Sequence, residues 1–290
     1  MSIHFAVQGS GKPLLLIHGL GGSLQSWNPI LAGLAAQREV IGIDLPGFGA
    51  TPALPGNATM AMLADAVTEF IDQQGLRGID AVGSSMGARL VLELARRGGI
   101  VGAVVSLNPG GFWQGWQRHA LYGSVSLSIR ALRLLRSHLD LIANYKLTRT
   151  LMLPQFSARP WALDAAVVLD ELRSYVASEA LDQTLHELAY GETQQGAPAG
   201  SIRQPLIIGW GRQDRVCFPS QARRAIALFP DARLHWFNNC GHFPHWDAPA
   251  EATRLILDGT AGITGSDRSA PVPRNGDGLR PATSGCGLRQ

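Results

Sequence analysis

Short, almost continuous apolar runs alternate along this chain with longer segments in which apolar residues recur at helical spacing. The apolar runs are residues 13–17, 39–43, 79–83, 103–107, 205–210 and 233–237. Strands that helices cover on both faces need such runs, because neither face meets water. The helical spacing spans residues 60–74, 86–97, 220–228 and 249–257. The pattern predicts an α/β fold with a mostly parallel central sheet flanked by helices.

A segment of different character separates the two halves of this pattern. Residues 109–200 show mostly helical spacing and no convincing strand, so we predict an inserted helical cap on a core made of residues 1–108 and 201–258. From residue 259 onward, 13 of 32 residues are Gly, Pro or Ser. Such a segment buries too little surface to offset its conformational entropy. We therefore predict that residues 259–290 form a disordered tail.

The sequence Gly83-Ser84-Ser85-Met86-Gly87 lies between a predicted strand and a predicted helix. In a sharp strand-to-helix turn the middle residue has a strained backbone, and flanking glycines remove Cβ atoms that would collide. The hydroxyl of Ser85 would then project above the sheet edge, beside the N–H groups at the start of a helix. The motif is common by chance, and its position after a strand is what makes Ser85 a candidate nucleophile rather than a simple helix cap.

A serine hydroxyl needs a base within hydrogen-bond reach and an acid that orients the base. Asp214 follows the apolar run that ends at Trp210, and His242 follows the run that ends near Phe237. The carboxyl ends of parallel strands meet at one edge of a sheet, so Ser85, Asp214 and His242 are expected to converge. His245 is a rival base three residues further on, and Asp214 has the alternative role of a turn residue that satisfies local backbone.

The sequence His18-Gly19-Leu20-Gly21-Gly22 directly follows the first apolar run. A glycine-rich turn at this place can bring the backbone N–H of Leu20 beside that of Met86, where the two would bind a developing oxyanion. The turn is neither a dinucleotide-binding glycine motif nor a P-loop, and the eight histidines show no metal-binding spacing. We expect no cofactor and no metal.

These motifs, in this order, resemble the α/β-hydrolase fold family from about Pro13 to Leu257. The matching pieces are His18-Gly19, Asp44-Leu45-Pro46-Gly47-Phe48-Gly49, the turn at Ser85, Asp214, and Gly241-His242-Phe243-Pro244. The resemblance implies an acyl-enzyme mechanism in which Ser85 attacks a carbonyl, His242 moves the proton, Asp214 orients the imidazole, and Leu20 and Met86 bind the oxyanion. It also sets this chain apart from relatives whose nucleophile is an aspartate or a cysteine.

The resemblance leaves several functions open. We expect cleavage of a carboxylic ester, or a related acyl bond, of a small hydrophobic molecule. The Ser84-Ser85-Met86-Gly87 sequence also resembles the elbow of carbon–carbon bond hydrolases that act on ring-fission diketones. Cofactor-free haloperoxidases share the triad, and some members of the fold are receptors that bind a ligand without turnover. The cap is rich in aromatic residues, and Phe112, Trp113 and Trp116 are our candidates for the substrate pocket.

Composition and charge exclude other classes of function. The 290 residues carry a net charge of +3, but the core and the cap are each almost neutral, and no run of Lys or Arg suggests nucleic-acid binding. Cys217, Cys240 and Cys286 form no C-x-x-C pair, which favours a reducing compartment, and we expect a cytoplasmic protein. No apolar run reaches the length of a signal segment or of a membrane span. The oligomeric state stays open.

The charges of the cap are polarised. Residues 118–149 carry six positive charges and one negative charge, whereas residues 159–192 carry two positive and seven negative charges. A stripe formed by Leu132, Leu135, Leu139 and Ile142 would make a basic amphipathic helix, which could contact an anionic lipid surface. The interpretation that we favour is a helix packed inside the protein with its arginines in water, in which case the membrane is no partner.

Overall fold

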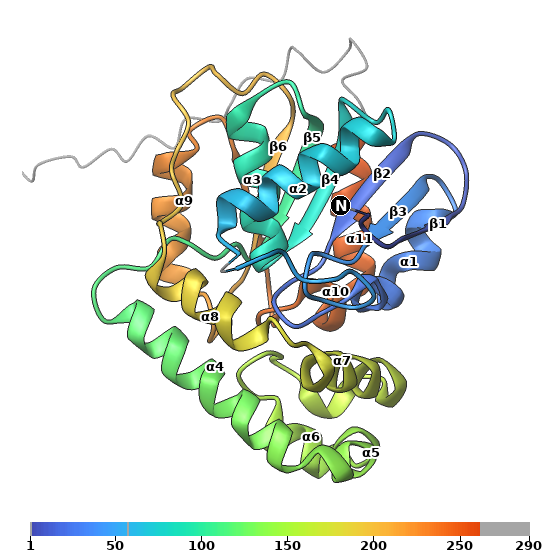
Figure 1. The fold of residues 1–290 in the computed structure, drawn as a ribbon, viewed down its shortest axis with the longest axis vertical. Coiled ribbons are helices and arrows are strands. Elements are labelled where there is room, and N and C mark those ends of the chain that lie inside the picture. The colour runs from blue at the N-terminus through green and yellow to red at the C-terminus, as the bar shows by residue number, and fades with distance from the viewer. Residues whose placement is uncertain (1, 57, 262–290) are drawn as a thin grey trace, which may run out of the picture.

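The computed structural model describes residues 2–56 and 58–261, and it shows a seven-stranded sheet between two layers of helices (Figure 1). The strand order across the sheet is β1-β3-β2-β4-β5-β6-β7. The strands are β1 (Phe5–Gln8), β2 (Pro13–Ile17), β3 (Glu39–Ile43), β4 (Ile79–Ser84), β5 (Val101–Leu107), β6 (Leu206–Gly211) and β7 (Arg233–Phe237). Every apolar run predicted as a strand is a strand, and β2 to β7 pair in parallel.

The edge strand β1 was not predicted from the sequence. It pairs antiparallel with β3, so that Phe5 lies opposite Ile43 and Gln8 opposite Val40. All four of its residues are exposed. A short strand at the edge of a sheet carries no buried apolar run, and therefore leaves little signal in the sequence.

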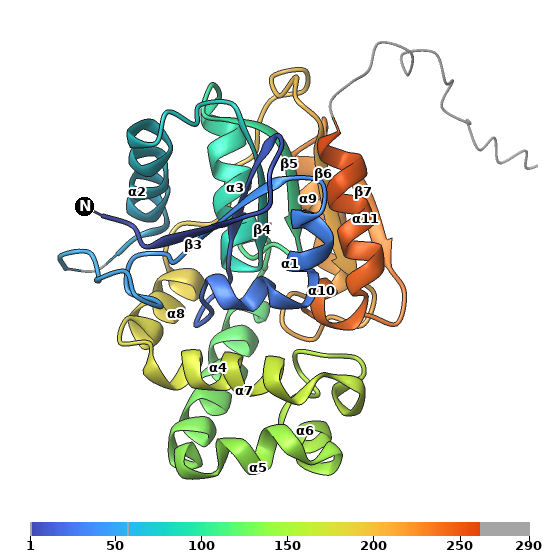
Figure 2. The ribbon, with the colours of Figure 1, turned by 90° about the vertical axis from the view of Figure 1, so that its right-hand side faces the viewer.

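Alternate residues of the central strands face two different hydrophobic clusters. In β2, Leu14 and Leu16 belong to the cluster under α1 (Asn28–Ala35) and α11 (Pro249–Thr260). Leu15 and Ile17 belong to the larger cluster, which includes residues of α2, α3 and α9 and continues into the cap. The bounds of these last helices are α2 (Met60–Gln73), α3 (Met86–Arg97) and α9 (Ala222–Leu228). Figure 2 shows α2 and α3 on one side of the sheet and α1 and α11 on the other. Cover on both faces explains the continuous apolar runs.

Five helices between β5 and β6 lie beyond the end of the sheet in both views (Figures 1 and 2). They are α4 (Gln117–Leu134), α5 (Leu139–Asn144), α6 (Lys146–Met152), α7 (Ala165–Ala177) and α8 (Leu181–Tyr190). Short 3-10 helices are η1 (Leu24–Trp27), η2 (Arg136–His138), η3 (Pro160–Ala162) and η4 (Pro219–Gln221), and α10 (Pro244–Asp247) is a single turn. None of the helices in the described part of the chain is long and apolar enough to cross a bilayer.

The leucine stripe of the cap does not lie on one helix. The chain breaks between α4 and α5 at residues 135–138, so Leu132 belongs to α4, whereas Leu139 and Ile142 belong to α5. All three side chains are buried. The stripe therefore faces the interior of the cap, as the favoured interpretation states, although it is divided between two helices instead of lying on a single amphipathic helix.

The helical core extends further toward the C-terminus than predicted. Helix α11 continues to Thr260, so residues 259 and 260 are not part of a tail, and residues 262–290 of the predicted tail lie outside the described residues. Gly259 allows this continuation because a Cβ atom there would come within 2.5 Å of Ile207 on β6. Gly259 was assigned to the tail because residues 259–290 are rich in glycine, whereas in the fold this glycine permits close packing.

A buried arginine ties this end of α11 to the sheet. Arg38 donates hydrogen bonds to the hydroxyl of Thr260 at 2.5 Å and to the carboxylate of Asp80 on β4 at 2.7 Å. Lys12 forms a second ion pair with Asp80, also at 2.7 Å. Arg38, Asp80 and Thr260 are all buried, so these contacts supply part of the hydrogen bonding that each polar group needs.

We predict that Thr260→Val lowers the free energy of unfolding by about 1–3 kcal/mol, because one nitrogen of the buried guanidinium loses its hydroxyl acceptor and keeps only the Thr260 carbonyl at 3.2 Å, with little change in volume. Denaturant unfolding monitored by circular dichroism measures the change. Thr253→Val on the same helix is the control, since that hydroxyl bonds only the backbone of its own helix, and it should change stability by less than about 0.5 kcal/mol. Equal effects of both variants would contradict the assigned role of the Arg38 contact.

Candidate active site

Ser85 has a backbone conformation that few residues other than glycine adopt. It joins β4 to α3 with φ 54° and ψ −109°. The flanking glycines are required by close backbone contacts: a Cβ atom at Gly83 would lie 2.1 Å from the carbonyl oxygen of Gly87, and one at Gly87 would lie 2.2 Å from that of Ile17. Local strain of this kind places the side chain at the sheet edge.

Ser85, Asp214 and His242 lie side by side, as the sequence predicts. The Nε2 atom of His242 lies 2.8 Å from the Oγ of Ser85, and the Nδ1 atom of His242 lies 2.9 Å from the carboxylate of Asp214. His242 follows β7, and Asp214 follows β6, so each side chain comes from the carboxyl end of its own strand. His242 and Asp214 are buried. The distances suit a serine, a base that can take its proton, and an acid that orients the base.

Asp214 accepts hydrogen bonds from four donors. The backbone N–H groups of Val216 and Cys217 donate to one oxygen, and His242 and the side-chain amide of Asn108 donate to the other, the latter at 2.5 Å. Four donors fix the orientation of the carboxylate, which in turn fixes the imidazole.

Asn108 is a part of this site that the sequence analysis missed. It follows β5 with φ 51° and is completely buried, and its amide oxygen accepts a hydrogen bond from the N–H of Gly211. Its place directly after a strand, at the same sheet edge as Asp214, is the signal that could have identified it.

Leu20 and Met86, whose N–H groups we predict to bind the oxyanion, both lie near Ser85. Leu20 and Met86 line the same cavity as Ser85 and His242. Within residues 2–56 and 58–261, neither backbone N–H group donates to a protein acceptor. The N–H of Met86 is free because the first residues of a helix have no acceptor in the preceding turn. Two unoccupied donors near a nucleophile are suited to a developing negative charge.

The cavity beside Ser85 lies between the core and the cap and encloses about 30 Å³. Its walls are mostly apolar, and the cap contributes Trp113, Phe156, Tyr175 and several aliphatic side chains. Among the described residues, the titratable side chains that line the cavity are His242, Cys217 and Tyr175. No lysine, arginine, aspartate or glutamate of the described residues lines it. The site is therefore apolar and almost filled.

Only one of the three aromatic residues predicted for the pocket lines it. Trp113 is part of the cavity wall, whereas Phe112 is buried against Trp210 and Phe229 and Trp116 is 67% exposed, next to Phe218. Consecutive side chains outside a helix point in different directions, so nearness in sequence did not decide which would face the site. Phe112 and Trp116 do not line the pocket, contrary to the prediction.

The other two histidines near the site have different surroundings. His18 accepts a hydrogen bond from the N–H of Leu45 at Nε2 and donates from Nδ1 to the carbonyl of Gly19, so it holds the glycine-rich turn. Burial lowers the pKa of His18. His245 is enclosed by Trp27 and Phe243, and burial, with the nearby His242, lowers its pKa to about 3. Neither is placed to serve Ser85 as a base.

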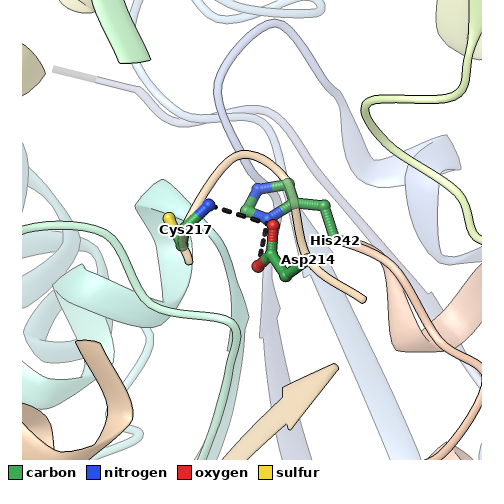
Figure 3. A group of neighbouring side chains, drawn as sticks. All are labelled: Asp214, Cys217 and His242. Atoms are coloured by element: carbon green, nitrogen blue, oxygen red, sulfur yellow. Dashed lines mark hydrogen bonds and ion pairs between the residues drawn. The ribbon is translucent and has the colours of Figure 1, made fainter. Parts of the chain in front are cut away.

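Asp214, Cys217 and His242 bring three potential metal ligands together (Figure 3). Their surroundings do not suit a metal ion. Both carboxylate oxygens of Asp214 already accept hydrogen bonds, one of them from the backbone N–H of Cys217. Burial raises the pKa of the Cys217 thiol well above its ordinary value, which disfavours the thiolate that a metal would need. The cluster is better described as part of the Ser85 site.

Two buried carboxylates connect the cap to loops of the site. Asp247 accepts hydrogen bonds from Ser157 and Ala158 and from the N–H of Gly241, directly before His242. Glu171 on α7 accepts a hydrogen bond from the hydroxyl of Ser26 at 2.7 Å. These contacts hold the cap against the loop that carries the base and against η1, which follows the glycine-rich turn.

Comparison with known proteins assigns the family. A family model described as the alpha/beta hydrolase fold matches residues 12–249, so the protein belongs to this family. It is similar to a 2-hydroxy-6-oxononadienedioate/2-hydroxy-6-oxononatrienedioate hydrolase of Pseudomonas putida, with 28% identity over 89% of this chain and 91% of the relative. It is also 24% identical to a 2-hydroxy-6-oxo-6-phenylhexa-2,4-dienoate hydrolase of Burkholderia cepacia, over 88% of this chain and 90% of the relative.

Solved structures share the fold. A hydrolase from Pseudomonas aeruginosa has a TM-score of 0.71 and 21% identity, and the match covers 90% of this chain and 94% of that one. An enol-lactonase from Burkholderia xenovorans has a TM-score of 0.69 and 18% identity, over 90% and 96% of the two chains. The family and these two relatives support a hydrolase, whereas the solved structures support the fold.

Glu171 generates a prediction about stability. Burial raises its pKa to about 7 from an ordinary 4.5, and Asp170 adds to the rise while the Ser26 hydrogen bond opposes it. Between these two values the folded chain keeps a proton that the unfolded chain loses, so the free energy of unfolding falls as pH rises. A glutamine at position 171 does not ionise, so it would remove this contribution to the pH dependence of the free energy of unfolding.

We therefore predict that wild type loses stability relative to Glu171→Gln between pH 4.5 and pH 8, by about 3 kcal/mol. Denaturant titrations of both proteins across this range measure the difference. Asp170→Asn, which removes an exposed neighbouring carboxylate, should keep most of the wild-type pH dependence. Parallel pH profiles of wild type and Glu171→Gln would show that Glu171 does not titrate in this range.

Proposed function

We propose that this protein is a serine hydrolase that cleaves a carboxylic ester of a small hydrophobic molecule through Ser85, His242 and Asp214. The observation that carries the proposal is the 2.8 Å contact between His242 and Ser85, made by a serine whose backbone is held at positive φ. A serine that only capped a helix would need neither the strained backbone nor the base.

The geometry supports a sequence of two acyl transfers. His242 takes the proton of Ser85 as its oxygen attacks the ester carbonyl, and Asp214 stabilises the imidazolium that forms. The N–H groups of Leu20 and Met86 bind the oxyanion. Collapse of the tetrahedral intermediate releases the alcohol, which receives the proton from His242. A water molecule activated by His242 then attacks the acyl group on Ser85, and release of the acid restores the serine.

The walls of the cavity favour an uncharged substrate. Trp113 and Phe156 provide apolar surface, and the side chains of Leu185 and Leu188 on α8 extend it. In the described part of the chain no cationic side chain lines the cavity, so a substrate carboxylate would lose its hydration without gaining an ion pair. A neutral ester of a hydrophobic acid has no such cost.

Substrate entry requires movement of the cap or rearrangement of its side chains. A cavity of about 30 Å³ has room for roughly one water molecule, whereas pockets for small-molecule ligands measure about 300–1,000 Å³. Tyr175, Leu185 and Leu188 of α7 and α8 close the cavity from the cap side. We infer that the described conformation is the closed one.

Carbon–carbon bond cleavage is the second candidate, because two of the relatives are named as hydrolases of hydroxy-oxo-dienoates. The Ser84-Ser85-Met86-Gly87 sequence also suits that class. Those substrates carry carboxylates, and the cavity of this chain offers them no cation. This difference is why the ester is preferred here.

We predict that a fluorophosphonate probe labels the wild-type protein and that Ser85→Ala abolishes labelling, since the probe reacts only with an activated serine. Ser84→Ala is the matched control: this neighbouring hydroxyl is buried and has no hydrogen-bond partner in the described residues, so labelling should persist. In-gel fluorescence measures both. An unlabelled wild type would refute the serine hydrolase and favour a ligand receptor of the same fold.

We predict that p-nitrophenyl esters are hydrolysed with a kcat/KM that rises from acetyl to hexanoyl, about fourfold for each added methylene that the apolar walls bury. A ring-fission diketone carrying a carboxylate should be turned over at least about 100-fold more slowly. Absorbance assays measure both reactions, with Ser85→Ala as the blank. Faster turnover of the diketone would make carbon–carbon cleavage the function.

A further inference from the structure

Large apolar side chains are exposed on the outer helices of the cap. Of the eleven that are strongly exposed in the described residues, nine lie between residues 109 and 200. Seven of these lie on α4, α5, α6 and the segments directly beside them, and together with three basic residues of the same segments we call them the cap tip. Its apolar members are Leu127, Leu134, Leu141, Tyr145, Leu147, Leu151 and Trp161, and its basic members are Arg130, Arg136 and Lys146.

Helical spacing places these residues on outward faces. On α4, Leu127, Arg130 and Leu134 are three and four residues apart and therefore share one face. Leu127 and Leu134 are 70% and 83% exposed. On α6, Leu147 and Leu151 are four residues apart and are 71% and 69% exposed. The inward faces hold a separate set of buried aliphatic residues, so the interior of the cap is complete without the exposed ones.

The cap tip lies at the end of the molecule most distant from the sheet. Figures 1 and 2 both show the C-terminal end of α4, together with α5 and α6, on the far side of α7 and α8. Helix α5 also packs directly against α6 and α7. The surface can thus contact a large flat partner without obstruction by the core.

The charge of the cap tip is positive. In the described part of the chain, Arg130, Arg136 and Lys146 form no ion pair and are exposed. The nearby acid Asp140 is paired with Arg173 at 3.4 Å, and Arg133 is paired with Asp182 at 2.5 Å. Three unpaired cations among seven exposed apolar side chains suit a partner that is both apolar and anionic.

We propose that the cap tip docks on the surface of an anionic phospholipid bilayer, with its leucines and Trp161 at the level of the acyl chains and its cations on the phosphates. Shallow apolar insertion beside basic residues is the way interfacial helices bind lipid. A second copy of the chain fits less well, because two identical cap tips would place their cations against each other. The proposal does not depend on the reaction at Ser85.

Co-sedimentation with vesicles tests the proposal. The probes are vesicles of phosphatidylcholine alone and of phosphatidylcholine with about one third phosphatidylglycerol, at low salt and at about 0.15 M salt. Wild type should bind the anionic vesicles, bind them less at the higher salt, and bind the neutral vesicles weakly. Absence of binding to anionic vesicles at low salt would overturn the proposal, and so would equal binding to both compositions.

Two double variants separate the contributions of charge and apolar surface. Arg130→Glu with Arg136→Glu should lower the partition coefficient at least about 30-fold, since each basic residue near an anionic surface contributes roughly fivefold. Leu147→Ser with Leu151→Ser should also weaken binding, even at low salt. Val7→Ser is the control, because Val7 is exposed on β1 and lies outside the cap. Circular dichroism melting verifies that each variant is folded.

Sedimentation velocity distinguishes the alternative occupant. A wild-type dimer that Leu147→Ser with Leu151→Ser converts to a monomer, together with no vesicle binding, would assign the cap tip to a second copy and overturn the lipid proposal. The lipid proposal would be supported by a monomeric wild type that binds anionic vesicles, if both double variants lose this binding and Val7→Ser keeps it.

Discussion

The tight turn between β4 and α3 is the constraint on which the rest of the site depends. Ser85 is held at positive φ, and the backbone on either side passes so close to neighbouring strands and helix that only glycine fits at positions 83 and 87. This arrangement fixes the serine hydroxyl at the carboxyl edge of the sheet and places Met86, the first residue of α3, in the wall of the same cavity. Every other functional group reaches this fixed point from a different strand end.

Buried polar contacts preserve the rest of the geometry. Asp214 is surrounded by four donors, so the imidazole of His242 has a defined orientation before any substrate binds. Asp247 and Glu171 connect the cap to the histidine loop and to the segment after the glycine-rich turn. The cap is therefore joined to the site by hydrogen bonds as well as by apolar packing. Any opening that admits substrate has to preserve or exchange these contacts.

The sequence predicted most of the sheet and missed features with a weak local signal. Six strands were recognisable because burial on both faces demands continuous apolar runs, whereas β1 is exposed and gave none. Asn108 was missed because its importance comes from Asp214, which is 106 residues away. Gly259 was assigned to a tail on composition, yet it packs against β6, and only the tertiary structure shows that contact.

The sequence by itself determined the alternation of strands and helices, the glycine-flanked serine, and the strand ends from which Asp214 and His242 emerge, because each follows from local spacing. Only the tertiary structure decided which side chains line the cavity and which face water. Trp113 lines the site while Trp116 does not, and the cap buries one set of leucines while exposing another. Such choices depend on how helices pack against one another, and packing joins residues that are distant in sequence.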